Sequence, residues 1–226
     1  MWSDFQIRIP SNKEWRNRLD PLSPGNKSPQ SILNFSKPNE ISKIITGSDK
    51  EIGGFSTVHF DQCKETSDSD PTITDQFGSF QGYLNIDPPL GRSNVHQSGY
   101  AMFRTQSLPL SPIFHQPTFH NWSNLSHLLL AVRGDHRAYS VNFQTDSTSA
   151  TDLYQHRLSL QTPGHWETVV IPLKDFVLTN NGVIQHQVDI DLTKVKTFGV
   201  GVNGRVLGPF RLDFKDVRCV SGEDTL

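Results

Sequence analysis

Hydrophobic residues alternate with polar ones along many short segments of this chain, and the clearest case is Ser126–Thr145. Its apolar side chains fall on one face of an extended strand from Leu128 to Val132, and again from Tyr139 to Phe143. Gly134-Asp135 between them suits a tight turn, because glycine accepts the positive φ that such turns need and aspartate can bond its own backbone. The segment therefore predicts a β-hairpin with one side in a core.

The same texture predicts further strands from Ile52 onward, separated by Gly, Pro and Asn. The predicted strands are Ile52–Phe60, Phe80–Ile86, Gly99–Thr105, His127–Arg133, Arg137–Thr145, Leu153–Gln161, Trp166–Ile171, Lys196–Val202 and Phe210–Val220. No sustained 3.6-residue period lies between them, which argues against crossover helices. We therefore expect an all-β fold, most naturally a jelly-roll β-sandwich.

Three stretches interrupt this pattern. Residues 1–40 are rich in Pro, Ser and Asn and predict an irregular N-terminal arm with at most short helices, one of them over Asn12–Leu19. The arm is expected to wrap its own domain, residues 41–222, with a partner groove as the alternative. Cys63–Gln76 is polar and predicts a surface loop, and the proline-rich Leu108–Asn121 predicts an irregular cover.

The charge, the cysteines and the N-terminal residues limit the classes of partner and the compartments that this chain can have. Lys and Arg number 21 against 23 Asp and Glu, so the net charge of −2 gives no electrostatic footprint for nucleic acid. Cys63 and Cys219 lie far apart, which predicts free thiols in a reducing compartment. No apolar signal region follows Met1, so we do not expect secretion. Asp4 and Glu14 dilute the basic charge that an organelle presequence needs, so we expect no clear presequence either.

Motifs for chemistry are weak, and we expect no catalytic residues, no metal site and no cofactor. Gly199–Gly204 matches G-x-G-x-x-G, but another strand follows instead of the helix that a dinucleotide site needs, which predicts a glycine-rich strand. The nine histidines form no H-E-x-x-H motif, and neither G-x-S-x-G nor a catalytic cysteine signature is present.

Polar residues beside the predicted core strands are the candidates for a ligand or partner surface. They are Asp49, Arg104, Arg133, Asp135, Arg137 and Asn142. An arginine fork binds a carboxylate well, and Asp49 and Asp135 are its expected partners. Two interpretations stay open: a network of bonds within the fold, or donors left free for a partner. Arg133-Gly134-Asp135 as an integrin ligand would need a mobile extracellular loop, and a rigid turn is expected instead.

Six blocks in order resemble the complex I intermediate-associated protein 30 family. They are Ser48–Ser56, Phe80-x-Gly82, Ser98–Arg104, Leu130–Asn142 with the pattern LAVRGDxRxYxVN, Trp166–Pro172 and Gly208–Phe210. The resemblance implies a galactose-binding-domain-like jelly roll that acts without catalysis as a chaperone-like assembly factor for mitochondrial NADH:ubiquinone oxidoreductase, respiratory complex I. It also implies binding to assembly intermediates and other assembly factors, in the matrix and peripheral to the inner membrane.

The ancestry of this fold leaves one alternative, a carbohydrate-binding or lost-enzyme β-sandwich. A sugar site would need an exposed aromatic platform, for which Trp122 and Trp166 are the candidates. Val169 and Ile171 follow Trp166 in a predicted strand, which favours a core position for this tryptophan.

Overall fold

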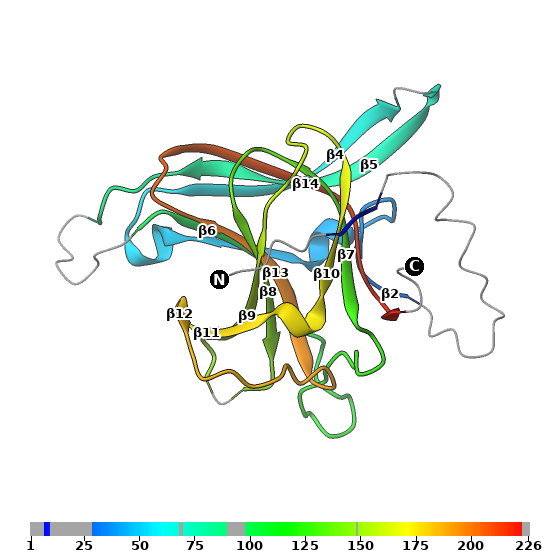
Figure 1. The fold of residues 1–226 in the computed structure, drawn as a ribbon, viewed down its shortest axis with the longest axis vertical. Coiled ribbons are helices and arrows are strands. Elements are labelled where there is room, and N and C mark those ends of the chain that lie inside the picture. The colour runs from blue at the N-terminus through cyan, green and yellow to red at the C-terminus, as the bar shows by residue number, and fades with distance from the viewer. Residues whose placement is uncertain (1–6, 10–28, 68–69, 90–97, 148, 223–226) are drawn as a thin grey trace.

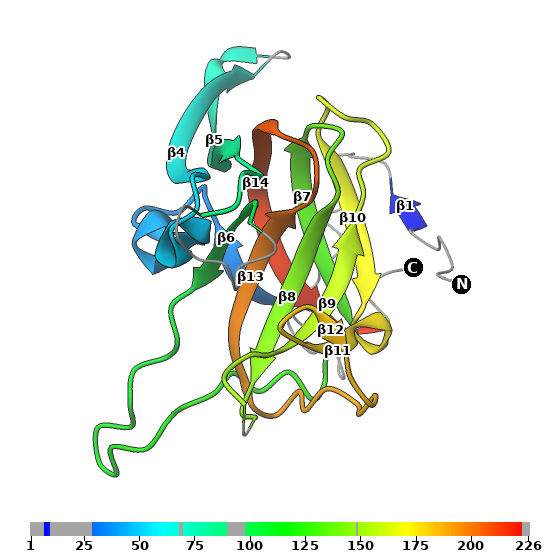
Figure 2. The same ribbon diagram turned by 90° about the vertical axis from the view of Figure 1, so that its left-hand side faces the viewer.

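Two antiparallel sheets packed face to face form the molecule in the computed structural model, which describes residues 7–9, 29–67, 70–89, 98–147 and 149–222 (Figures 1 and 2). The first sheet has the order β1 (Ile7–Ile9), β10 (Glu167–Pro172), β7 (His127–Gly134), β14 (Gly208–Val220), β5 (Asp70–Leu84) and β4 (Thr57–Ser67), and β2 (Gln30–Asn34) also pairs with β14. The second sheet has the order β12 (Val183–Ile184), β11 (Val177–Asn180), β9 (Asp152–Leu158), β8 (Tyr139–Thr145), β13 (Val195–Asn203), β6 (Tyr100–Thr105) and β3 (Ile44–Ser48).

Helical structure in the described residues is limited to three short 3-10 turns. These are η2 (Glu40–Lys43), η3 (Asp49–Ile52) and η4 (Leu173–Asp175). The all-β sandwich expected from the sequence is therefore confirmed. The strand β2 lies within the segment 1–40 that the sequence analysis assigns to the arm, and the helix predicted over Asn12–Leu19 falls outside the described residues.

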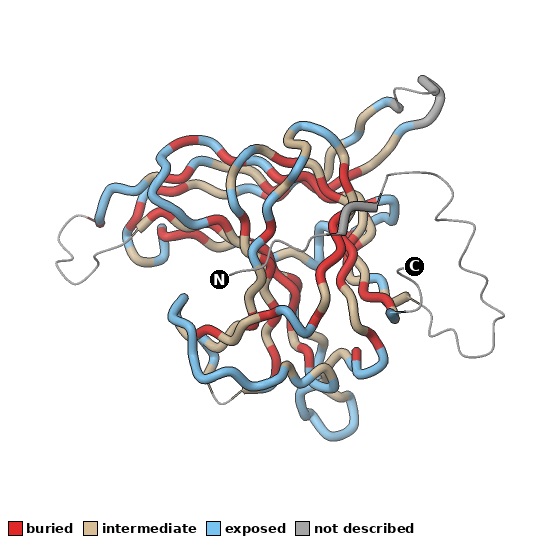
Figure 3. The backbone as a smooth tube through the Cα atoms, in the orientation of Figure 1, coloured by how far each residue is buried: buried red, intermediate tan, exposed pale blue. Residues whose placement is uncertain are grey.

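Alternating side chains of the two sheets meet in one core. Phe103 of β6 is only 1% exposed and lies at its centre. Its ring centroid lies 4.8 Å from that of Phe60 and 5.3 Å from that of Phe214, both in the opposite sheet. Figure 3 shows the buried segments running along the facing strands. Edge-to-face aromatic contacts of this kind add to the burial of apolar area, so the centre of the sandwich is well defined.

The hairpin predicted for Ser126–Thr145 is wrong. The strand β7 pairs with β10 and β14 in the first sheet, whereas β8 pairs with β13 and β9 in the second (Figure 2). The connection between them crosses from one sheet to the other, and Gly134 is not among the described glycines with positive φ. Alternation tells which side chains face a core, but a hairpin and a crossing between sheets bury the same alternate positions, so the pattern cannot separate them.

The surface loop predicted over Cys63–Gln76 is also wrong. This segment is strand in β4 and β5, a long hairpin that extends beyond the body of the sandwich (Figure 2). Its polar composition has a physical reason, because beyond the sandwich neither face of the hairpin packs on the core. Ion pairs join this hairpin to neighbouring strands of the same sheet, between Glu65 and Arg133 of β7 and between Asp75 and Lys215 of β14.

The proline-rich segment Leu108–Asn121 is irregular as expected, apart from a bridge between His120 and Val195. It does not cover the core, however. Leu110, Ile113 and Phe114 are exposed, and the loop projects from the lower end of the molecule (Figure 2). The glycine-rich Gly199–Gly204 motif is confirmed as part of a strand, β13, and its turn.

Candidate functional site

The six candidate residues lie in three separate places. Asp49 begins η3, in a loop beside β4. Arg133, Asp135 and Arg137 lie at and after the end of β7. Arg104 and Asn142 are in the second sheet, on β6 and β8. The structure therefore does not bring the six together into one cluster.

Asp49 is a fully buried carboxylate, and within the described residues it pairs with no arginine. Its Oδ1 accepts from the Ser56 backbone N at 2.9 Å, and its Oδ2 accepts from the Ser56 hydroxyl at 2.9 Å and from the Gly99 N at 2.7 Å. The Ser56 hydroxyl in turn accepts from the Asn85 N at 3.0 Å. We call Asp49, Ser56, Asn85 and Gly99 the Asp49 clamp. A buried carboxylate satisfied by three donors fixes the two segments that supply them, and the Ser56 hydroxyl joins the segment of Asn85 to both.

Gly54 is required by this clamp. A Cβ atom at Gly54 would lie 2.4 Å from the Asp49 Cγ, closer than any real contact. The Gly53-Gly54 pair of the sequence is therefore explained at its second position by the close approach of a buried carboxylate.

Asp135 fixes the crossing between the two sheets. Its Oδ1 accepts from the Arg137 N and from the Tyr139 hydroxyl, both at 2.9 Å, and its Oδ2 accepts from the Arg211 N at 2.9 Å. Burial, together with the charge of Asp135, raises the pKa of Tyr139 well above its ordinary value. The phenol therefore stays protonated and donates, so Asp135 joins β14 of the first sheet to β8 of the second.

Arg133 pairs with carboxylates that the sequence analysis does not name. Its Nη2 lies 3.0 Å from Asp213 Oδ2 and its Nη1 lies 2.9 Å from Glu65 Oε2. Partial burial opposes the charge, but the bonds to Glu65 and Asp213 outweigh it and raise the pKa of Arg133. Its guanidinium carbon also lies 4.6 Å from the centroid of Trp166, whose ring has Lys215 Nζ at 4.7 Å as well.

The Arg137 side chain binds the backbone of the turn between β13 and β14 and not a carboxylate. Its Nε donates to the carbonyl of Pro209 at 2.7 Å and its Nη1 to the carbonyl of Val206 at 2.8 Å. Gly208 in this turn has φ of 128°, a conformation that favours glycine. The side chains of Arg133, Asp135 and Arg137 therefore form no ion pair with one another, although Asp135 accepts from the Arg137 backbone N and each side chain also binds a residue of β14.

Arg104 and Asn142 flank Gly199 on the outer face of the second sheet. The strand register pairs Gly199 with Arg104 on one side and with Asn142 on the other. Asn142 Oδ1 accepts from Gln155 Nε2 at 2.8 Å, and Arg104 Nη1 reaches the Thr105 carbonyl at 3.3 Å. In the described part of the chain no carboxylate forms an ion pair with Arg104.

The loops joined by the Asp49 clamp and by Arg137 carry a group of exposed apolar side chains that the sequence analysis misses. A Cβ at Gly99 would lie 3.1 Å from Ile86 Cγ2 and 3.3 Å from the Gly204 carbonyl, so these loops touch one another. We call this group the end patch; its members are Phe55, Tyr83, Ile86, Val206 and Leu207. The only signal for it in the sequence is that the blocks Ser48–Ser56, Phe80–Gly82 and Gly208–Phe210 build or adjoin these loops.

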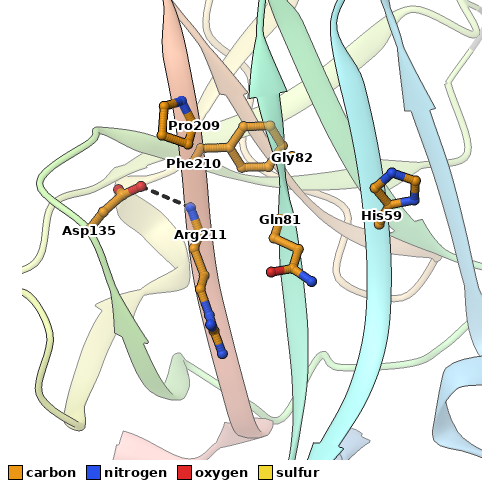
Figure 4. Close-up of a pocket in the computed structure, with 7 residues that line it drawn as sticks. All are labelled: His59, Gln81, Gly82, Asp135, Pro209, Phe210 and Arg211. Carbon is orange, nitrogen blue, oxygen red and sulfur yellow. Dashed lines mark hydrogen bonds between the residues drawn. The ribbon is translucent and has the colours of Figure 1, made fainter.

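A shallow hollow of about 520 Å³ lies beside the end patch on the outer face of the first sheet (Figure 4). Its lining residues are His59, Gln81, Gly82, Asp135, Pro209, Phe210 and Arg211. Gly82 is required by the close approach of the neighbouring strand, since a Cβ there would lie 2.0 Å from the Thr57 carbonyl. Among the seven lining residues none is a serine, cysteine or lysine, and Asp135 is already engaged. The arrangement suits binding better than covalent chemistry.

Neither tryptophan considered for sugar stacking is an exposed platform. Trp122 is 2% exposed and packs edge-on against Phe143 at 5.1 Å. Trp166 is not in the core as expected; it is half-buried on the outer face of the first sheet, against Arg133, Lys215 and Phe77. Across the described residues no group of three His, Cys, Asp or Glu side chains is placed to hold a metal ion.

Sequence comparison connects this geometry to known proteins. The family model described as Complex I intermediate-associated protein 30 matches residues 33–214. The mitochondrial protein of that name from Neurospora crassa is 32% identical over 90% of this chain and 82% of its own length. That of Mus musculus is 27% identical over 80% of this chain and 53% of its own, and that of Drosophila melanogaster 32% identical over 60% and 47%. The matches thus span about half the length of these two animal relatives.

Solved structures resemble the fold at low sequence identity. A family 11 carbohydrate-binding module of a Clostridium thermocellum cellulosomal cellulase superposes with a TM-score of 0.58 at 11% identity, over 86% of this chain and 95% of that one. The same type of module in complex with a mixed-linked tetrasaccharide gives a TM-score of 0.57 at 12% identity, over 85% and 95%. At this identity the likeness shows a shared β-sandwich and nothing about the ligand.

Proposed function

Because this chain belongs to the complex I intermediate-associated protein 30 family, we propose that it is a non-catalytic, chaperone-like binding module that holds assembly intermediates of mitochondrial respiratory complex I. The observation that carries this proposal is the family match over residues 33–214, which includes the whole Asp49 clamp, the crossing fixed by Asp135 and the end patch. Its relatives are named as mitochondrial proteins associated with intermediates of complex I.

The end patch is the surface that we assign to partner proteins. Five large apolar side chains are exposed on adjoining segments, and exposed charged residues lie within four positions of them in the sequence, namely Glu51, Asp87, Arg205 and Arg211. An apolar centre with a polar rim is the usual anatomy of a protein interface. The partners proposed are assembly intermediates and other assembly factors.

The fixed geometry of these loops supports binding. Asp49 and Arg137 bind backbone groups on both sides of the patch, so the loops need little further ordering when a partner arrives. A surface that is ordered before binding retains more of its contact energy as affinity.

Holding without bond chemistry is the mechanism that the site supports best. The hollow of Figure 4 has no nucleophile paired with a base among its lining residues. The carbohydrate-binding alternative lacks its platform, because Trp122 is buried and Trp166 lies against two cations. The proposed location is the mitochondrial matrix, with peripheral contact to the inner membrane.

Affinity purification tests the proposal. The tagged chain is recovered from mitochondria in a gentle detergent extract, and complex I subunits and assembly factors are expected with it. The double variant Val206→Ser/Leu207→Ser, which removes the most exposed members of the end patch, is expected to recover about tenfold less. Recovery of no complex I subunit or assembly factor by the unaltered chain would contradict the function. Equal recovery by the variant would contradict only the surface.

A further inference from the structure

The loop Leu108–Phe119 presents the most exposed large apolar side chains in the described part of the chain. Ile113 is 78% exposed and Phe114 is 72% exposed, and Leu110 nearby is 55% exposed. Figures 1 and 2 both place this loop at the lower end of the molecule, whereas the connection from β13 to β14, which carries Val206 and Leu207, lies toward the upper end. It is therefore a second apolar surface, separate from the end patch.

Internal bonds hold the tip of this loop in one shape. The Ser111 N donates to the Gln116 carbonyl at 2.8 Å, and the His115 N donates to the Ser111 carbonyl at 2.8 Å. Nearer the base of the loop, the Thr118 hydroxyl donates to the Pro109 carbonyl at 2.6 Å. Ile113 and Phe114 therefore stand at the apex of a closed turn, and their exposure is part of its fixed geometry.

The loop is also free of formal charge. No Asp, Glu, Lys or Arg occurs from Thr105 to Val132, and the polar residues between Gln106 and His120 are Ser, Gln, Thr and His. At its base Lys196 lies 5.7 Å from the Phe119 ring and pairs with Asp146 at 2.9 Å. Near the end patch, by contrast, exposed charged residues occur within four sequence positions of its members, namely Glu51, Asp87, Arg205 and Arg211. Of these two surfaces, the loop tip is the one that can enter an apolar phase without burying a charged group.

Neither the net charge nor a spanning helix in the described residues supplies another way to contact a bilayer. The net charge of −2 provides no attraction to an anionic lipid surface. Within the described residues no helix is long and apolar enough to cross a membrane. A peripheral contact would then depend on apolar insertion, for which an uncharged, protruding tip is suited.

We propose that the tip of loop Leu108–Phe119 inserts Ile113 and Phe114 into the interfacial layer of a phospholipid bilayer. This rests on the proposed membrane contact and names the residues that make it. Because the two apolar surfaces lie toward opposite ends of the sandwich, the end patch would then point away from the lipid and stay open to a protein partner (Figure 2).

Vesicle sedimentation with the full chain tests the proposal. The probes are vesicles of phosphatidylcholine alone and of phosphatidylcholine mixed with phosphatidylglycerol, each at low and high salt. The chain is expected to bind both with similar affinity at either salt concentration, because the tip carries no cation. The variant Ile113→Ser/Phe114→Ser is expected to bind both kinds of vesicle more weakly, by about tenfold or more. The matched control Val206→Ser/Leu207→Ser is expected to bind like the unaltered chain.

Each other result overturns the inference. Equal binding by the tip variant would show that lipid is contacted elsewhere and would leave the proposed membrane contact standing. Binding confined to anionic vesicles and abolished by salt would show an electrostatic contact instead. Failure of the unaltered chain to bind any vesicle would contradict both the tip insertion and the membrane contact. If loss of the tip side chains reduced capture of complex I subunits in detergent extract, the tip would be a protein contact.

Discussion

The carboxylate of Asp135 binds the backbone of Arg211, since Asp135 Oδ2 accepts from the Arg211 N at 2.9 Å. This bond fastens the connection between β7 and β8 to β14 of the first sheet. The other oxygen of Asp135 accepts from the Tyr139 hydroxyl at the start of β8, so a single side chain bridges the two sheets.

Replacement of Asp135 by asparagine is expected to destabilise the fold by about 1–3 kcal/mol, because an amide group would point its own donor at a backbone or phenol donor. Denaturant unfolding measures this. The control is Asp146→Asn, which alters an exposed ion pair with Lys196 and is expected to cost less than about 1 kcal/mol. Equal losses in the two variants would show that Asp135 has no special role at the crossing.

Gly54→Ala is expected to destabilise the protein by about 1–3 kcal/mol, because the new Cβ displaces the buried Asp49 carboxylate from its donors. Thermal unfolding gives the comparison. The matched control is Gly204→Ala, where a Cβ meets nothing within 4 Å and φ is not positive. If both variants have the same melting temperature as the unaltered chain, the contact between Gly54 and Asp49 is not tight in solution.

Stability is expected to fall as the pH drops below about 6.5, the ordinary pKa of histidine. Burial lowers the pKa of His156 and of His120 in the folded chain, so the unfolded chain binds protons at a higher pH than the folded one does. The stability from these groups is fully present above the unfolded pKa and is lost as the pH falls toward the folded pKa. His156 Nδ1 is buried without a hydrogen-bond partner, which agrees with a neutral ring.

The measurement is the free energy of unfolding between pH 7 and pH 5, taken by denaturant titration at each pH. His156→Gln is expected to flatten the dependence on pH, whereas His186→Gln, at an exposed position, is expected to leave it unchanged. An identical slope for His156→Gln and the unaltered chain would remove His156 as a source of the dependence.

Arg137→Gln is expected to loosen the turn between β13 and β14, because the side chain loses its bonds to the carbonyls of Val206 and Pro209. Amide hydrogen exchange across residues 203–208 should quicken about tenfold, with little change elsewhere. Arg157→Gln, on an exposed side chain of β9, serves as the control. Unchanged exchange in the Arg137 variant would mean that the turn is held by its backbone alone.

The sequence predicted the class of fold because alternation of apolar and polar positions is a local property of each strand. It placed β6, β7, β8, β10, β13 and β14 within a few residues of their observed bounds. It missed β1, β2, β3, β11 and β12, which are short. The predicted strands Ile52–Phe60 and Phe80–Ile86 overlap β4 and β5, but the polar part of this hairpin, Cys63–Gln76, was read as a loop. A strand that extends beyond the core buries neither face, so its sequence lacks the apolar alternation by which strands are recognised.

Residue type and position beside the predicted strands were enough to select the candidate residues, but not to predict which residues they bind. Arg133 and Asp213 are 80 positions apart, and Ser79 and Asp213 are 134 apart. Nothing in the local pattern pairs such residues, because the choice depends on which strands become neighbours in the sheet. Asp49 and Asp135 accept from backbone and hydroxyl donors instead of the expected arginine side chains, for the same reason.

By itself the sequence determined that this chain forms a β-sandwich, which side chains face its core, and the six blocks that mark its family. The tertiary structure alone decided that β7 and β8 lie in different sheets, that Asp49 and Asp135 hold backbone instead of arginine, and that apolar side chains gather in the end patch and at the tip of loop Leu108–Phe119. Periodicity fixes the two faces of a strand, whereas sheet membership and exposure depend on contacts between residues far apart in the chain.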